Sequence, residues 1–219
     1  MTVYGSATGQ LDESAPLLAD LGPYSVAQLE AERLAAACNA IILRPGVEYG
    51  PGCQAWTARV ARWLQAGRLG DMGAVGDGRC NLVYVDDLVS AVLLALEKHE
   101  LRGRSFNLAA PDPPTWNDYF IGFARALGAV PVRRVTRRRQ AIETRLAIPL
   151  KMAEKTLALA HLPTKWLPPP IPPSLLPLCS QDIHLETSHA EQQLGLRWTP
   201  LAAGLRRAAA WCLAGCPPE

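Results

Sequence analysis

The sequence lacks the features of a membrane-spanning, metal-binding or secreted protein. It has no run of about 20 apolar residues, and its N-terminus lacks the charged-then-apolar order of a signal peptide. The six cysteines form no CxxC pair and have no accompanying histidines, which argues against zinc. A net charge of +2 is too small to imply nucleic acid or an anionic membrane as an obligatory partner. We therefore expect a cytoplasmic protein with reduced thiols.

Helix and strand patterns alternate along the first half of the 219-residue chain, which predicts a parallel α/β sheet. The expected strands cover residues 2–4, 40–43, 82–85 and 106–108, and the expected helices cover residues 24–38, 55–66 and 86–96. Beyond Pro111 the pattern becomes mostly helical, with one short strand expected at 130–135. The expected helices there cover residues 115–127, 138–160, 188–194 and 202–213.

A proline-rich segment interrupts this second part of the chain. Residues 163–177 contain seven prolines, so we expect extended or irregular backbone with nothing helical between them. The segment is interpreted as a connecting loop over the small lobe, and a lid or a polyproline docking segment is the alternative.

Short motifs spread over nearly the whole chain occur in a characteristic order. They are Val3-Tyr4-Gly5, the helical Tyr24-Ser25-Val26-Ala27-Gln28, Leu43-Arg44-Pro45-Gly46, Tyr49-Gly50-Pro51-Gly52, Leu82 to Leu88 (LVYVDDL), Ser105-Phe106-Asn107-Leu108 and Leu194 to Pro200 (LGLRWTP). Each motif is weak alone, but the ordered set resembles the extended short-chain dehydrogenase/reductases, a family of NAD-dependent epimerase/dehydratase-like proteins.

The resemblance implies an α/β fold, with a partial Rossmann-like parallel sheet and a small C-terminal α-rich substrate lobe. Residues 1–110 are predicted to be the C-terminal half of the Rossmann-like domain, and residues 111–219 the substrate-binding lobe. The family's strand, glycine-rich turn and helix for the dinucleotide pyrophosphate is expected to be lacking. Gly70, Gly73 and Gly76 have the spacing of such a turn, but they follow a helix and precede a strand, which indicates a loop. NAD or NADP would then bind only if the missing half were supplied, and the open sheet edge predicts a possible homo-oligomer.

Tyr24 is the candidate catalytic residue, because the family uses the tyrosine of its YxxxK helix to exchange a proton with the substrate hydroxyl. A packed tyrosine at a helix start is the structural alternative. The spacing places residue 28 on the same helix face, where the family has a lysine. A free phenol titrates near pH ~10, and an ammonium group would favour the anion, but Gln28 carries no charge. Gln28 could still hydrogen-bond the ribose of the nicotinamide.

Further candidate contacts follow from the same resemblance. Arg44, Pro45 and Gly46 follow an apolar strand, where the family contacts nicotinamide, although a structural turn explains them nearly as well. Val47 stands where the family often has an asparagine that faces substrate, and Arg79 is a candidate contact for a substrate diphosphate. Asp86 and Asp87 are interpreted as helix-capping residues rather than paired catalytic carboxylates.

The strongest local charge feature is a run of five arginines between residues 133 and 139. It is interpreted as a solvated face, with contact to a diphosphate or an anionic lipid surface as alternatives. The absence of interleaved aromatic residues argues against nucleic acid.

Taken together, the sequence predicts an NAD(P)-dependent epimerase/dehydratase-like oxidoreductase. Its small-molecule substrate would be a nucleotide sugar or a similar alcohol. Catalysis by this chain alone is doubtful, because the pyrophosphate-binding half, the family's serine or threonine and the lysine beside Tyr24 are all expected to be lacking. Thr2 and Ser6 are the hydroxyls near Val3-Tyr4-Gly5, and neither is at the family's offset. The alternative is a non-catalytic homologue that acts as a binding or interaction protein.

Overall fold

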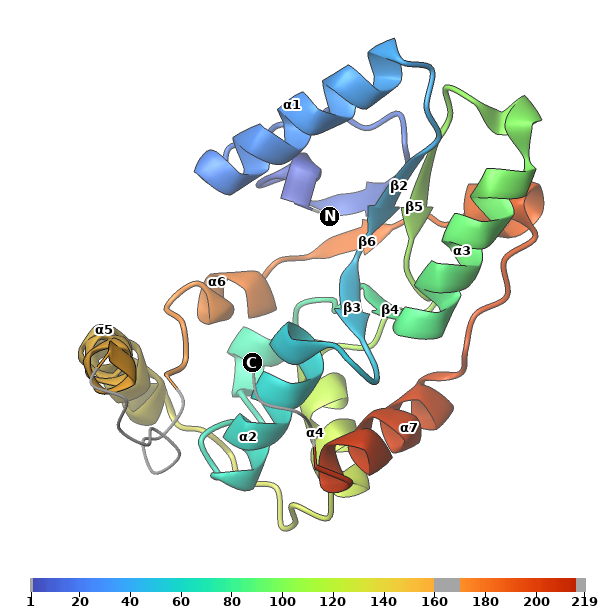
Figure 1. Cartoon of the computed structure of the whole chain (residues 1–219). Helices are drawn as coiled ribbons and strands as arrows, with labels where there is room; N and C mark the ends of the chain where they lie inside the picture. Colours follow the sequence, from blue (N-terminus) through green and yellow to red (C-terminus); the bar gives the residue numbers. More distant parts are fainter. Residues whose placement is uncertain (1, 160–169, 216–219) are drawn as a thin grey trace.

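Six short strands form three parallel pairs at the centre of the molecule (Figure 1). The structure is a computed structural model that describes residues 2–159 and 170–215. Strand β1 (Gly9–Leu11) pairs with β6 (Ile183–Leu185), β2 (Ile42–Pro45) with β5 (Ser105–Leu108), and β3 (Val47–Tyr49) with β4 (Leu82–Tyr84). The helices are α1 (Pro23–Ala37), α2 (Arg59–Gln65), α3 (Val85–Glu97), α4 (Trp116–Ala126), α5 (Arg137–Leu159), α6 (Leu175–Cys179) and α7 (Leu201–Leu213). The expected α/β class with parallel strands is confirmed.

One segment of chain changes partner in the middle of this arrangement. Strands β2 and β3 are separated only by Gly46, whose N–H donates to the carbonyl of Leu108 at 2.9 Å. The next N–H, from Val47, donates to the carbonyl of Asn81 at 2.7 Å, so the pairing passes from β5 to β4 at this point. A Cβ atom on residue 46 would lie 2.1 Å from the Asn81 carbonyl oxygen, which only glycine avoids.

Three expectations about the strands were wrong. Residues Thr2–Tyr4 form a 3-10 turn instead of a strand, because the backbone bonds locally: the N–H of Gly5 donates to the Thr2 carbonyl at 3.3 Å and the N–H of Ala7 to the Tyr4 carbonyl at 3.1 Å. Residues 130–135 form no strand, since Pro131 removes a donor and only an isolated bridge joins Asp71 to Arg134. The sequence patterns also missed β1, β3 and β6, which are three residues long each.

The helix starts differ in how they are stabilised. Thr115 caps α4 with a reciprocal bond to Asp118, which confirms the predicted start. The expected cap of α3 by Asp86 or Asp87 was wrong: no side chain caps this helix. Asp87 is instead buried and accepts hydrogen bonds from the N–H and the hydroxyl of Thr199, at 2.8 and 2.7 Å.

Two segments, residues 70–76 and 163–177, were expected to be loops. Gly70 to Gly76 lies between α2 and β4 and contains a short 3-10 helix, so the loop interpretation is confirmed. Of the proline-rich segment 163–177, residues 163–169 lie outside the described residues. The expectation of nothing helical was wrong for its end, because α6 contains Pro177.

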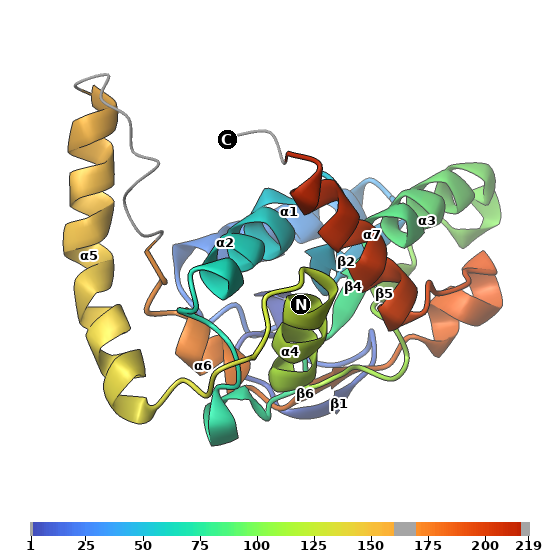
Figure 2. The same cartoon turned by 90° about the horizontal axis from the view of Figure 1, so that it is seen from below.

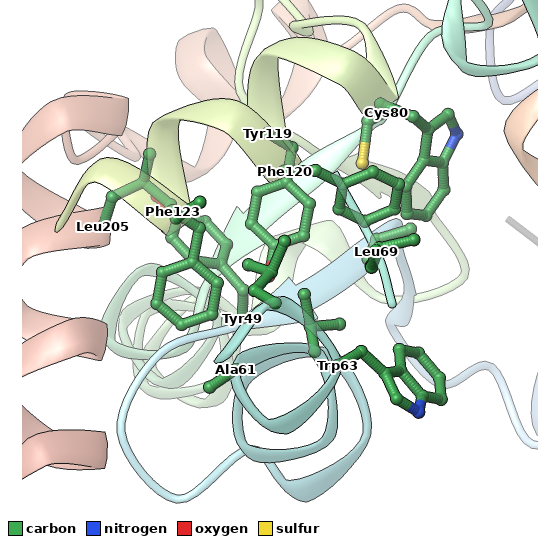
Figure 3. Packing of buried hydrophobic residues seen from close by; sticks show 14 of the residues in the cluster. Tyr49, Ala61, Trp63, Leu69, Cys80, Tyr119, Phe120, Phe123 and Leu205 are labelled. Carbon is green, nitrogen blue, oxygen red and sulfur yellow. The ribbon is translucent and has the colours of Figure 1, made fainter. Parts of the chain in front are cut away.

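The largest apolar core crosses residue 110, the predicted domain boundary, which stays a prediction. Trp63 of α2 belongs to the same cluster as Tyr119, Phe120 and Phe123 of α4 and Leu205 of α7 (Figure 3). The aromatic rings of Tyr119 and Phe123 stack with centroids 5.9 Å apart. Helices from the second half therefore hold the first half in place.

Candidate functional site

A cavity of about 480 Å³ opens where β2 ends beside α1. One wall is the face of α1 that carries Tyr24, Gln28 and Glu32, which are spaced four residues apart and so lie on one side of the helix. The opposite wall is the end of β2, with Arg44, Pro45 and Gly46. The π-helix Gln54–Ala58 closes a third side with Trp56, and Thr2 and Cys53 are among the other lining residues. Five of the predicted site residues therefore meet in one cavity.

Tyr24 and Gln28 lie at the accessible edge of this cavity. Tyr24 is 67% exposed and Gln28 is also exposed, so a ligand can reach both side chains. Pro23 occupies the first position of α1, where its missing N–H costs nothing, and the hydroxyl of Ser25 donates to the Gly22 carbonyl at 2.8 Å. The start of the helix is thus fixed directly beneath the tyrosine.

Arg44 is turned toward the protein. Its side chain is 7% exposed and its Nε donates to both carboxylate oxygens of Glu32, at 3.1 and 3.2 Å. Its Nη1 donates to the Tyr4 hydroxyl at 2.8 Å and to the Glu13 carbonyl at 3.0 Å. Burial lowers the pKa of Arg44, but the hydrogen bonds and charge of its partners outweigh this and raise it. The positive charge is therefore balanced inside the protein by Glu32.

The polar network continues away from the cavity. The Tyr4 hydroxyl donates to Asn107 Oδ1 at 2.7 Å, and the N–H of Asn107 donates to Glu13 Oε1 at 2.7 Å. The second oxygen of Glu13 lies 2.9 Å from Nδ1 of His189. Burial raises the pKa of Tyr4, and the nearby Arg44 opposes this shift.

Sequence reasoning did not assign a role to Tyr4, Glu13, Glu32 or Asn107. The signal was available for three of them, since Tyr4 and Asn107 stand in quoted motifs and Glu32 lies eight residues after Tyr24 on the same helix face. The structure joins them in one network that links α1, β2 and β5.

The other two predicted residues lie elsewhere. Val47 is buried in β3 and does not line the cavity. Arg79 is exposed, away from the lining, with its Nε 3.8 Å from a carboxylate oxygen of Asp182. Of the two hydroxyls near the first motif, Thr2 reaches the cavity, whereas Ser6 donates to Asp20.

The described residues show neither a metal site nor a membrane-spanning helix. No group of three or more His, Cys, Asp or Glu side chains there could hold a metal ion. No helix among residues 2–159 and 170–215 is long and apolar enough to cross a membrane.

The fold is similar to solved epimerases. UDP-glucuronic acid 4-epimerase from Bacillus cereus, in complex with NAD, is 18% identical with a TM-score of 0.67, and the match covers 97% of this chain and 59% of that one. UDP-glucose 4-epimerase from Thermotoga maritima, with UDP-glucose, is 19% identical with a TM-score of 0.67, covering 97% and 60%. UDP-N-acetylglucosamine 4-epimerase from Bacillus cereus is 15% identical with a TM-score of 0.65, covering 96% and 62%. The chain thus spans about three fifths of the length of these structures, and no curated protein sequence matches it.

The family comparison corrects one expectation. The sequence was expected to be a C-terminal part that lacks the dinucleotide-binding half. This was wrong, because the match to the family begins at the first residue, so its dinucleotide-binding part is represented in the chain. Residues 1–109, just under half of the chain, match the NAD dependent epimerase/dehydratase family, and nearly the whole chain has the Rossmann-like fold of the epimerases.

Proposed function

We propose that the protein is an NAD(P)-dependent oxidoreductase of the epimerase/dehydratase type that acts on a hydroxyl group of a nucleotide sugar or a similar alcohol. The observation that carries the proposal is the cavity in which Tyr24, Gln28 and residues 44–46 meet. The match of residues 1–109 to the family and the fold shared with epimerases that bind NAD and UDP-sugars support it.

The cavity residues fit the nicotinamide and ribose portion of a dinucleotide. A volume of about 480 Å³ lies within the range of ligand pockets, roughly 300–1,000 Å³. The side chains of Ile42, Leu43 and Trp56 give apolar walls, and the amide of Gln28 offers both a donor and an acceptor to ribose hydroxyls. The cofactor, when bound, supplies the acceptor for hydride.

The chain itself would manage the proton. The phenolate oxygen of Tyr24 takes the proton of the substrate hydroxyl on oxidation, and the phenol formed in this way returns it on reduction. Gln28 can orient this hydroxyl or the ribose, but it carries no charge and cannot stabilise a tyrosinate. Arg44 does not replace the lysine, because Glu32 neutralises its guanidinium. Turnover should therefore be slow at neutral pH.

The uncharged Gln28 and the pairing of Arg44 with Glu32 also favour a second function. With Gln28 at the lysine position and Arg44 paired to Glu32, no side chain lining the described cavity brings an unbalanced positive charge to Tyr24. A non-catalytic homologue that binds a ligand or a partner would keep the cavity without the chemistry.

Binding is the first test. Calorimetry with NAD⁺, NADH, NADP⁺ and NADPH should detect at least one dinucleotide, and Ala31→Trp should abolish its binding by filling the cavity. Ala36→Trp is the matched control, because Ala36 is exposed on the same helix and does not line the cavity. Absence of binding by all four dinucleotides, or binding that survives Ala31→Trp, would contradict the proposed site.

Catalysis is the second test. With UDP-sugars as probes and absorbance of the reduced cofactor as the readout, Gln28→Lys should raise turnover about 10²-fold or more, the usual scale of acid–base assistance. Tyr24→Phe in the Gln28→Lys background should remove this gain while cofactor binding stays within about twofold, since the phenol contributes its hydroxyl and not the cavity shape. If Gln28→Lys binds cofactor and adds no turnover with any probe, the non-catalytic function is favoured.

A further inference from the structure

Helix α5 stands apart from the rest of the fold. Figures 1 and 2 both place it at the margin of the molecule, and its 23 residues span about 35 Å at 1.5 Å per residue. Within the part of the chain that the structure describes, its hydrogen bonds and ion pair to the body come from its first two turns: the amide of Gln140 donates to the carbonyls of Met72 and Val135 at 3.1 Å, and Glu143 pairs with Arg68. The remainder projects from the body.

The projecting part exposes a stripe of apolar side chains. Ile148, Met152 and Leu159 are 66%, 67% and 73% exposed. Their spacings of four and seven residues place them on one side of the helix. Exposing large apolar side chains to water is unfavourable in free energy, so this stripe is suited to contact with an apolar medium.

Positive charge flanks the same stripe. Arg145, Lys151 and Lys155 lie three or seven residues from Ile148 and are exposed, and within the described residues no ion pair engages them. The helix carries six Lys and Arg residues against two Glu residues, and Arg133 and Arg134 precede it. Since the whole chain has a net charge of only +2, the positive charge is concentrated on this element.

The chemistry of the stripe selects among possible partners. Single-stranded nucleic acid is held by stacking on aromatic rings, and residues 133–159 contain no Phe, Trp or Tyr. A lipid bilayer surface uses both features, because apolar side chains enter the boundary below the headgroups while Lys and Arg extend to anionic phosphates. We propose that α5 docks the protein peripherally on an anionic lipid surface, with Ile148, Met152 and Leu159 toward the acyl chains and Arg145, Lys151 and Lys155 toward the headgroups.

The test is co-sedimentation of the full chain with phosphatidylcholine vesicles, with and without about one third phosphatidylserine. Binding is expected only to the anionic vesicles, and it should weaken between ~0.1 M and ~1 M salt, as the Debye length falls from about 10 to about 3 Å. Replacing all three cations (R145Q, K151Q and K155Q) should lower the partition coefficient about 100-fold, since each basic residue near such a surface contributes roughly fivefold. The variant R62Q, R125Q and R206Q makes the same change in net charge on exposed positions elsewhere and should bind as the unmodified protein does.

The apolar stripe has its own control. Replacing Ile148, Met152 and Leu159 with Ser should lower binding at least tenfold, whereas replacing the exposed Val89, Leu93 and Leu96 of α3 with Ser should not. Circular dichroism melts check that all variants are folded. Failure to bind anionic vesicles overturns the proposal, as does equal loss in the control variants. Two other results would also overturn the proposal if vesicle binding is absent. One is binding of an oligonucleotide that depends on the same three cations, and the other is self-association in analytical ultracentrifugation that depends on them.

Discussion

At the scale of single residues, the shape of the candidate site depends on the ion pair between Glu32 and Arg44. Glu32 is 11% exposed and faces Arg44 from the helix that also carries Tyr24 and Gln28. Because Arg44 stands at the end of β2, this ion pair fixes the distance between the two walls of the cavity. The pair therefore positions helix α1 against β2, and removing both charges together should destabilise the protein less than removing one of them.

Glu32→Ala should destabilise the protein by about 3–5 kcal/mol, because it leaves the buried guanidinium of Arg44 without its counter-charge. Urea unfolding measures this loss. The matched control is Glu30→Ala, whose exposed pair with Arg33 should contribute less than about 1 kcal/mol. The double replacement Glu32→Leu with Arg44→Met should recover part of the loss, and an effect no larger than that of Glu30→Ala would show that the pair has no such role.

Residue patterns predicted which residues line the cavity but not the hydrogen bonds and ion pair that hold them in place. Tyr24, Gln28, Arg44, Pro45 and Gly46 could be brought together from motif order and helix spacing, because each lies in a contiguous segment. The partnership of Arg44 with Glu32 could not, since it joins residues on different elements whose distance only the packed fold sets. The placement of Val47 outside the cavity depends on the change of strand partner at Gly46, which the packed fold also sets.

At the scale of elements, the helices were easier to predict than the strands. Helices α1, α3, α4 and α7 were expected close to their observed bounds, because apolar periodicity over 11 to 15 residues is a strong signal. Strands β1, β3 and β6 have three residues each, too few for an alternating pattern to show. Their positions follow from pairing with distant segments, such as residue 9 with residue 183, which no local pattern contains.

The change of partner between β2 and β3 makes Gly46 the most sensitive backbone position of the site. Gly46→Ala should cost about 3 kcal/mol or more in urea unfolding, because its Cβ would overlap the carbonyl oxygen of Asn81 and the backbone must move. It should also weaken dinucleotide binding, since the same residue lines the cavity. Gly52→Ala is the control: its φ of +84° adds strain of about 1 kcal/mol, but the new Cβ would meet open space. Equal losses in the two variants would exclude the close approach as the cause.

At the scale of the whole molecule, the largest core joins the two halves of the chain, and two of its members are thiols. Cys80 precedes β4 and Cys179 ends α6, and both are fully buried. Burial raises the pKa of each thiol, and at Cys80 the nearby charge of Cys179 acts in the same direction. Because this core crosses residue 110, loosening it should unfold both halves in one transition rather than release one lobe.

This core predicts a loss of stability in alkaline solution. The raised pKa keeps both thiols protonated in the folded state, so the stability they contribute is complete below the pKa of the unfolded thiol, near pH 9. Above that pH the thiols ionise first in the unfolded chain. The free energy of unfolding should then fall by about 1 kcal/mol for each thiol between pH 9 and pH 10, approaching about 1.4 kcal/mol per pH unit at higher pH. Urea unfolding between pH 9 and pH 10 in the presence of a reductant measures this slope. The buried Tyr49 and Tyr119, whose pKa values are also raised by burial, add to it as their phenols begin to ionise in the unfolded chain near pH 10. Cys80→Ala should reduce the slope by about the contribution of one thiol, whereas replacing the exposed Cys38 with Ala should leave it unchanged. If Cys80→Ala keeps the full slope, the alkaline sensitivity does not come from this buried thiol.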